Sequence, residues 1–159
     1  MISVELANDI LNLITAKSTK LTTVSTGQCW LGFSAGDPGD NGASFNEPNP
    51  STYPSYARVQ LNINAAQDWT DKWGSVANKS VSLLEEITTS ECLEEGGWPT
   101  FTHFGIFSNK SGGKPHAWDL LTDPDGEPDE DGQYPAKTLK VNKGEVAVFR
   151  TDSLKLTFK

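Results

Sequence analysis

The sequence predicts a mostly β protein, either an antiparallel β-sandwich or a jelly-roll-like fold, with one N-terminal amphipathic α-helix. Three observations predict this class. Many short stretches alternate apolar and polar residues, segments rich in Gly and Pro separate them, and helical periodicity is confined to the beginning of the chain. Short strands divided by regular turn signals are typical of antiparallel sandwiches. A length of 159 residues fits one domain, so we predict a single domain over 1–159.

The helix is predicted over residues 3–16, within an N-terminal segment 1–17. Ser3 is placed to cap its first turn, and Glu5 suits the positive end of the helix dipole. Two uses stay open, packing on the sheet or docking of a partner subunit through Leu6, Ile10 and Leu13. Apolar side chains recur at three- and four-residue steps and form one face: Leu6, Ala7, Ile10, Leu11, Leu13 and Ile14.

The sandwich is predicted over residues 21–159, and its first strands are 28–34 and 56–63. In the second of these, strict alternation predicts that one set of side chains faces the core and the other set faces away. Residues 68–74 fit either one helical turn or a loop clamped onto the core, and residues 79–88 fit a strand. The apolar set in 56–63 is Ala57, Val59, Leu61 and Ile63, and the opposite set is Tyr56, Arg58, Gln60 and Asn62.

Residues 98–122 predict a β-hairpin around a Gly-Gly turn. In its first strand His103, Gly105 and Phe107 share one face, and Phe104 and Ile106 share the other. We interpret this hairpin as the central pair of the sandwich, with Phe104, Ile106 and Trp118 as packing residues. Three short strands, 137–141, 145–149 and 154–158, are predicted to close the chain, with a turn at 142–144 between the first two.

Three long loops are predicted at 35–54, 88–97 and 123–135. The first holds seven Gly and Pro residues in total, a density that excludes regular structure. Loops of that length inside a compact domain are usually functional or ordered by a partner.

The net charge of −8 argues against nucleic acid and anionic membrane surfaces as partners. No stretch of 18 or more apolar residues is present, and the first residues lack the features of a secretion signal, so we expect synthesis in a cytoplasm. Cys29 and Cys92 are expected to be free thiols in that reducing compartment. Their spacing from the two histidines matches no zinc motif, and no cofactor is predicted.

The loop 123–135 is strongly acidic, which raises the question of calcium binding. The best match to a helix–loop–helix calcium loop begins at Glu127, but its twelfth position is Thr138 instead of the required Glu. A solvated acidic loop is therefore the preferred interpretation, and no metal site is predicted. The only calcium candidates are Asp125, Glu127, Asp129 and Asp131.

Catalytic groups are not brought together by any pattern in the sequence. His103 and His116 lack a Ser, Cys or carboxylate positioned to complete a triad. The pairs Glu85/Glu86 and Glu94/Glu95 raise the possibility of glycoside hydrolysis, but neighbours on a strand face opposite ways and no facing pair can be chosen. We therefore predict no catalytic residues and no enzyme activity.

The five tryptophans have two candidate roles. Trp30, Trp98 and Trp118 lie in or beside predicted strands and are expected to pack in the core or at a subunit interface. Trp69 and Trp73 are less constrained and are the candidates for stacking on a sugar ring. Charge is also uneven, because the end of the chain is rich in Lys and the middle is acidic, an arrangement that suits electrostatically complementary assembly.

The ordered series of these motifs resembles small bacteriophage virion structural proteins of the tail fibre or head decoration type. The series begins with the amphipathic helix and continues through Cys-Trp-Leu-Gly-Phe-Ser at 29–34, Tyr-Ala-Arg-Val at 56–59, Thr-His-Phe-Gly-Ile-Phe at 102–107, Ala-Trp-Asp-Leu-Leu-Thr at 117–122 and Val-Asn-Lys-Gly-Glu-Val at 141–146. The long loop 35–54 and the acidic segments 85–97 and 123–135 depart from the usual pattern.

The resemblance implies a non-enzymatic virion structural subunit that decorates the capsid or forms part of the tail or fibre. It also implies homo-oligomers, other virion proteins as partners, and assembly in the host cytoplasm. The alternative is a carbohydrate- or receptor-binding module of a phage fibre that contacts a host surface glycan through Trp69, Trp73 or the long loops.

Overall fold

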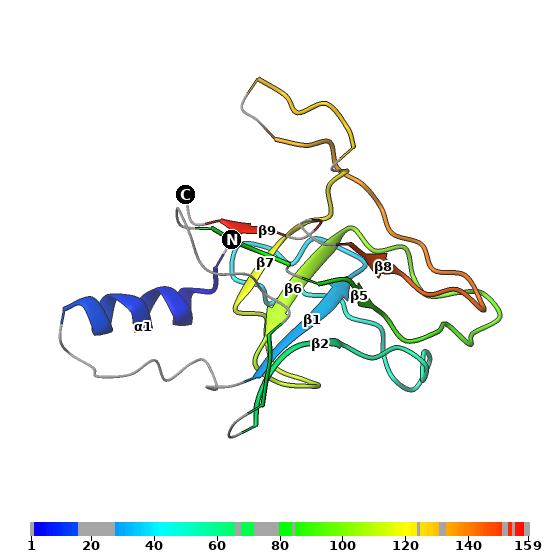
Figure 1. Ribbon diagram of the computed structural model, residues 1–159, viewed down its shortest axis with the longest axis horizontal. Coiled ribbons are helices and arrows are strands. Elements are labelled where there is room, and N and C mark those ends of the chain that lie inside the picture. The colour runs from blue at the N-terminus through cyan, green and yellow to red at the C-terminus, as the bar shows by residue number, and fades with distance from the viewer. Residues whose placement is uncertain are drawn as a thin grey trace.

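A computed structural model describes residues 2–15, 28–65, 68–71, 80–83, 85–123, 125–130, 133–150, 153 and 155–157. Within them the chain is mostly antiparallel β with one helix, arranged as a sandwich, which confirms the predicted class (Figure 1). The elements are α1 (Val4–Ile14), β1 (Gln28–Ser34), β2 (Val59–Ala65), β3 (Asp68–Asp71), β4 (Ser80–Ser82), β5 (Ile87–Thr88), β6 (His103–Phe107), β7 (Ala117–Leu120), β8 (Val148–Phe149) and β9 (Lys155–Thr157).

The main sheet has five strands in the order β3-β2-β1-β6-β7, and every neighbouring pair is antiparallel. The predicted hairpin exists as β6 and β7, but it is not the central pair. β1 is the central strand, and β7 lies at the edge. Sequence order misled here because β1 pairs with both β2 and β6, across long loops, and not with its chain neighbour alone.

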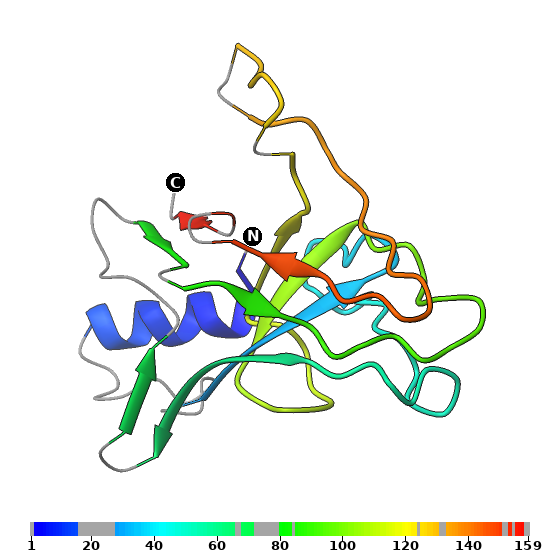
Figure 2. The ribbon, with the colours of Figure 1, turned by 45° about the vertical axis from the view of Figure 1, so that its right-hand side comes forward.

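The second layer is a long irregular ribbon formed by residues 85–101 and 139–150, which run antiparallel to each other. Its pairing includes Ile87 with Phe149, the bond from Trp98 N to Val141 O (2.9 Å) and the bridge between Phe101 and Leu139. Figure 2 shows β5 and β8 lying in front of the main sheet, separate from it. We call this layer the ribbon.

Three predicted strands change form in the ribbon and beside it. The predicted strand 79–88 is divided into β4 and β5, the predicted strand 137–141 is reduced to the single bridge at Leu139, and the predicted strand 145–149 is reduced to β8. The turn at 142–144 is present, since Glu145 N bonds to Asn142 O at 3.0 Å and Gly144 has a φ of 79°. The segments on its two sides pair with 85–101 and not with each other, which explains the weak strand character.

The main core lies between the sheet and the ribbon. Leu31 and Phe33 of β1 and Phe104 of β6 project into it from the sheet, and Trp98 and Phe101 project from the ribbon, all almost fully buried. Phe33 lies against Phe149 with ring centroids 5.4 Å apart. Burying each large side chain of this kind stabilises the fold by roughly 1.5–3 kcal/mol.

The other face of the sheet is also covered, which the alternation patterns did not predict. Loop 35–54 lies across Gly105 and Trp118, and Phe45 packs edge-on against Phe107 with centroids 5.2 Å apart. A Cβ at Gly105 would lie 2.5 Å from the ring of Phe45, so only glycine allows this approach. Trp30, Trp98 and Trp118 are all buried, as predicted.

The helix begins as predicted and is slightly shorter than predicted. Ser3 caps it, because its Oγ accepts a hydrogen bond from Leu6 N at 3.1 Å. The preceding residues attach the helix to the edge strand β7, through the bridge between Ile2 and Ala117 and the bond from Ser3 N to His116 O (2.8 Å). From that attachment α1 extends away from the sheets (Figure 1). No helix among the described residues is long and apolar enough to cross a membrane.

Residues 68–71 form strand β3, so the helical turn considered for this segment is wrong. The strand pairs with β2 through Asn64 and Trp69. Trp69 and Trp73 have a helical spacing of four, but Trp69 lies in a strand and Trp73 lies outside the described residues.

The described residues 121–123, 125–130 and 133–137 form a projecting arm beyond β7, visible at the top of Figure 1. Thr122 bridges Ala136, and Lys137 N bonds to Leu121 O at 2.8 Å. We call this segment the acidic arm.

Candidate functional site

The candidate site is built around Arg58, which lies just before β2 and beneath two surface loops. Its side chain is 3% exposed, although the alternation in 56–63 predicted that it faces solvent. Ala57, predicted to face the core, is exposed instead. Both predictions are wrong because the alternation of side chains begins only at Val59, the first residue of β2. The residues before Val59 belong to the preceding loop.

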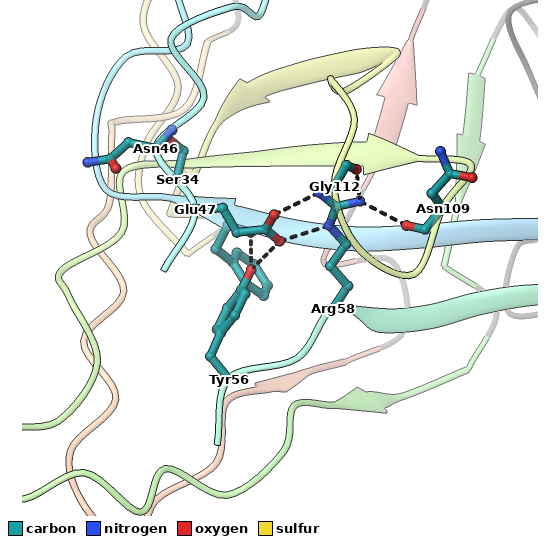
Figure 3. Close-up of polar contacts among 8 residues, drawn as sticks. Ser34, Asn46, Glu47, Tyr56, Arg58, Asn109 and Gly112 are labelled. Atoms are coloured by element: carbon teal, nitrogen blue, oxygen red, sulfur yellow. Dashed lines mark hydrogen bonds and ion pairs between the residues drawn. The ribbon is translucent and has the colours of Figure 1, made fainter. Parts of the chain in front are cut away.

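Arg58 makes a two-pronged ion pair with Glu47 of loop 35–54. Its Nε donates to Glu47 Oε1 at 2.8 Å, and its Nη2 donates to Oε2 at 2.7 Å. Its Nη1 donates to the carbonyls of Asn109 and Gly112 at 2.8 and 2.9 Å. Figure 3 shows the guanidinium between the Glu47 carboxylate and the turn 108–113. One side chain therefore joins two loops to the sheet, and we call this arrangement the Arg58 clamp.

The guanidinium also stacks on the sheet. Its central carbon lies 3.4 Å from the centroid of the Phe107 ring, a cation–π contact in a desolvated position. Gly32 provides the space, because a Cβ there would lie 2.9 Å from Glu47 Oε1 and 3.0 Å from the Phe107 ring. Gly32 and Gly105 are register partners on the neighbouring strands β1 and β6. At these two positions no side chain projects from the sheet toward the loops.

Tyr56 extends the clamp to the central strand. Its hydroxyl donates to Glu47 Oε1 at 3.1 Å and accepts from Phe33 N at 2.9 Å. Desolvation by burial, together with the nearby Glu47 carboxylate, raises the pKa of Tyr56 well above its ordinary value. The phenol therefore stays protonated and continues to donate to Glu47.

A further anchor holds the loop at the end of β1. Ser34 Oγ accepts a hydrogen bond from Asn46 N at 2.8 Å and donates to Gly36 O at 2.7 Å, and Ala35 N bonds to Asn46 O at 3.0 Å. Beyond these anchors the loop tips are exposed and polar: Asp37, Asp40, Asn41, Ser44, Asn46, Asn109, Lys110, Ser111 and Lys114. The result is a polar surface carried by loops that are fixed from below.

A second polar cluster ties residues 50–56 to the ribbon. Glu94 accepts from Ser55 N at 3.0 Å, from Ser55 Oγ, and from Trp98 Nε1 at 3.0 Å. Desolvation raises the pKa of Glu94, but hydrogen bonds, those from the Ser55 side chain and backbone foremost, outweigh it and hold the pKa at about 2. Burial raises the pKa of the neighbouring Cys92 thiol, which lies 3.5 Å from Glu94 Oε2.

This second cluster has a structural role, and neither its hydroxyl nor its thiol is reactive. Ser55 Oγ donates to Glu94 while accepting from Trp98 Nε1 at 3.0 Å and Leu93 N at 3.1 Å. Both of its lone pairs are occupied, so the oxygen has no electron pair free to attack a substrate. The Cys92 thiol is completely buried and protonated, which is the inert form.

The binding candidates predicted from sequence are not gathered at the Arg58 clamp. Leu6 is buried at the base of α1 and Ile10 is half-buried, while the side chain of Leu13 lies outside the described set. Trp69 is placed in β3 by its backbone only, and Trp73 lies outside the described residues. No pattern in the sequence distinguishes Glu47, Tyr56 and Arg58, because the contacts that define them join distant segments.

The calcium candidates lie in the acidic arm. Asp125, Glu127 and Asp129 are exposed there, and Asp131 lies outside the described residues. Among the described residues no three acidic, His or Cys side chains converge as a metal site would require. The base of the arm is closed by an ion pair of 2.9 Å from Lys137 to Asp123, and hydrogen bonding to Lys137 lowers the pKa of that carboxyl.

The side chain of each histidine contacts a nearby hydroxyl group. His103 contacts Thr102 Oγ1 at 2.9 Å, and His116 contacts Ser108 Oγ at 2.9 Å beside the turn that Arg58 holds. Cys29 and Cys92 form no disulfide, as predicted; Cys92 is buried and Cys29 is half-buried.

The fold and the clamped loops describe a β subunit that presents ordered loops, and comparison with known families agrees with that description. A family model described as Podophage GP4 fiber I protein gp80 matches residues 1–157. The chain belongs to this family. No curated protein matches the sequence.

Membership in a family of phage fibre proteins gives the chain a structural role in the virion and confirms the resemblance to virion structural proteins. Such a role implies contacts with other virion proteins. The match spans the helix, the main sheet, the clamped loops and the ribbon, so every feature described above belongs to the fibre family's region.

Proposed function

We propose that this chain is a non-enzymatic fibre subunit whose clamped loops form a rigid contact surface for another virion protein. The observation that carries the proposal is the Arg58 clamp, in which one guanidinium uses four hydrogen bonds to hold two loops. Loops fixed in advance lose little conformational entropy on binding, so their polar groups contribute more of their energy to affinity.

In this proposal the Arg58 clamp supports assembly and has no catalytic role. Its charged and hydroxyl groups face each other beneath the loops and are occupied there, so the loop tips supply the contact groups. The predicted single domain, the homo-oligomer and assembly in the host cytoplasm are part of the same proposal.

The location on the virion is tested by immunogold labelling of intact particles with an antibody to this chain. We expect label on fibres at the tail. Label on the head surface would instead support capsid decoration, and absence of the chain from purified particles by mass spectrometry would overturn the virion role in this proposal.

The role of the clamped loops is tested in particles grown with Lys110→Glu and Ser111→Trp together. These two exposed residues lie at the tip of the turn 108–113, so the fold should keep its stability while incorporation into particles falls. The matched control is Thr138→Glu, which is also exposed but belongs to the segment after the acidic arm. Equal incorporation of both variants would contradict a contact role for the loops.

A second candidate is a carbohydrate- or receptor-binding module, favoured by the exposed amides, hydroxyls and lysines on the fixed loops. Such groups recognise sugar hydroxyls when held rigidly, and Trp69 or Trp73 would supply stacking faces. A glycan array probes this candidate directly. No hits, together with unchanged phage adsorption for Trp69→Ala and Trp73→Ala, would remove it.

A further inference from the structure

The outer face of the ribbon carries apolar side chains that nothing in the described chain covers. Leu93, Val146 and Val148 are 62%, 43% and 48% exposed. Thr88 lies beside them and is also exposed, while Ile87, Thr89 and Ala147 point inward and are buried. Ser90 is exposed too, but its Oγ donates to Ser55 O at 2.7 Å, so it belongs to the edge of this face. Figure 2 shows β5 and β8 as the front layer on this side. An exposed apolar seam with a polar rim is typical of a protein interface.

The ribbon's charges are divided between its two sides. The segment 85–95 carries exposed acidic side chains and the segment 140–150 carries exposed basic ones. Glu145 is the exception on the basic side, and it accepts hydrogen bonds from the backbone and side chain of Asn142. The acidic set is Glu85, Glu86, Glu91 and Glu95, and the basic set is Lys140, Lys143 and Arg150.

Some of these charges are satisfied within the chain. Lys143 pairs with Glu95, and Lys140 donates to the carbonyls of Gly96 and Trp98. Among the described residues the side chains of Glu86, Glu91 and Arg150 form no hydrogen bond or ion pair. Continuing the pairing of Ile87 with Phe149 by one residue puts Glu86 opposite Arg150 at one end of the ribbon.

We propose that the outer face of the ribbon binds the same face of a second copy of this chain, about a two-fold axis parallel to the strands. That rotation puts the acidic side of each ribbon over the basic side of the other and superposes the apolar seams. This rotation leaves the position of each residue along the strand direction unchanged, so Arg150 of each copy lies over Glu86 of the other. A two-fold axis across the strands would place like charges together, which is why the parallel axis is chosen.

The proposal deepens the proposed fibre role and rests on it, because it names the surface through which subunits associate. Its test is the oligomeric state of the purified full chain, measured by sedimentation velocity over a range of concentrations and salt. We expect a reversible dimer that weakens as salt screens the charged rim. A wild-type chain that stays monomeric at every concentration overturns the proposal, and it does so even if particles contain the protein.

The apolar seam is tested with Val148→Asp, which places a charge in the seam twice, once from each copy. We expect the dissociation constant of the dimer to rise at least about 100-fold. Leu120→Ser is the matched control, since Leu120 is 45% exposed on the edge strand β7 of the other layer. Equal dissociation constants for both variants would overturn the proposal, and circular dichroism checks that each variant is folded.

The two-fold geometry is tested by charge reversal. Glu86→Arg and Arg150→Glu should each weaken the dimer about tenfold, because each creates two like-charge contacts across the interface. The double variant restores opposite charges at both contacts and should return to within about threefold of wild type. A double variant as weak as the single variants would overturn this arrangement of the two copies.

Discussion

At the residue scale, Arg58 is the point on which the ordered loops depend. It unites Glu47, the Asn109 and Gly112 carbonyls and the Phe107 ring in one buried arrangement. Removing one partner of such a pair leaves the other charge desolvated and the carbonyls without donors.

Arg58→Met should therefore lower the free energy of unfolding by about 3 kcal/mol, measured by urea denaturation. Arg58→Lys should recover little of this loss, because an ammonium group cannot bond two oxygens and two carbonyls in the planar arrangement of a guanidinium. The double variant Glu47→Gln with Arg58→Met should be less destabilised than the sum of the single variants. A loss below about 1 kcal/mol for Arg58→Met would contradict the clamp.

Glu94 predicts a dependence of stability on pH. Its pKa in the fold is about 2, against an ordinary value of 4.5. A carboxyl whose folded pKa is depressed stabilises the fold above its unfolded pKa, and that contribution is lost as pH falls from 4.5 toward about 2. Glu94→Gln should lower stability at neutral pH and flatten the profile between these values. Urea midpoints measured across this range check it, and parallel profiles for wild type and variant would contradict it.

At the element scale, loop 35–54 acts as a cover for the second face of the main sheet. Gly105→Ala introduces a Cβ that would lie 2.5 Å from Phe45, so the loop must lift. We expect a loss of about 1–3 kcal/mol in stability and faster proteolysis within the loop. Gly36→Ala is the control, because a Cβ at Gly36 meets nothing within 4 Å. Equal protease resistance of the two variants would show that the cover does not depend on this contact.

The elements also show which structure a sequence pattern can predict. Strand 28–34 was predicted with its observed bounds, because it holds the large apolar residues Trp30 and Leu31 and a run of turn residues follows it. Strand β3 was not predicted, since the Trp69 and Trp73 spacing suggested a helical turn while pairing with β2 decides the strand. Arg58 was assigned to the solvent face because alternation describes local geometry, and its partners come from residues 47, 109 and 112. Local patterns predict strands, whereas the clamp arises from contacts between distant segments.

At the scale of the whole molecule, the two layers share one core and should unfold together. Phe33 of the main sheet packs against Phe101 and Phe149 of the ribbon, with centroid distances of 5.5 and 5.4 Å. The Glu94 cluster adds a polar tie between the ribbon and Ser55, which precedes β2. Neither layer can separate without exposing these rings to water, so partial unfolding costs nearly as much as complete unfolding.

We therefore expect one cooperative transition in urea for the full chain. Tryptophan fluorescence reports on both layers, because Trp98 lies in the ribbon and Trp30 and Trp118 lie in the main sheet, and far-UV circular dichroism reports on the strands. The two signals should give the same midpoint, and Gly105→Ala should shift both midpoints equally, although its change lies on the sheet face away from the ribbon. Separate midpoints would show that the ribbon and the main sheet fold as independent units, which would contradict the prediction of a single domain.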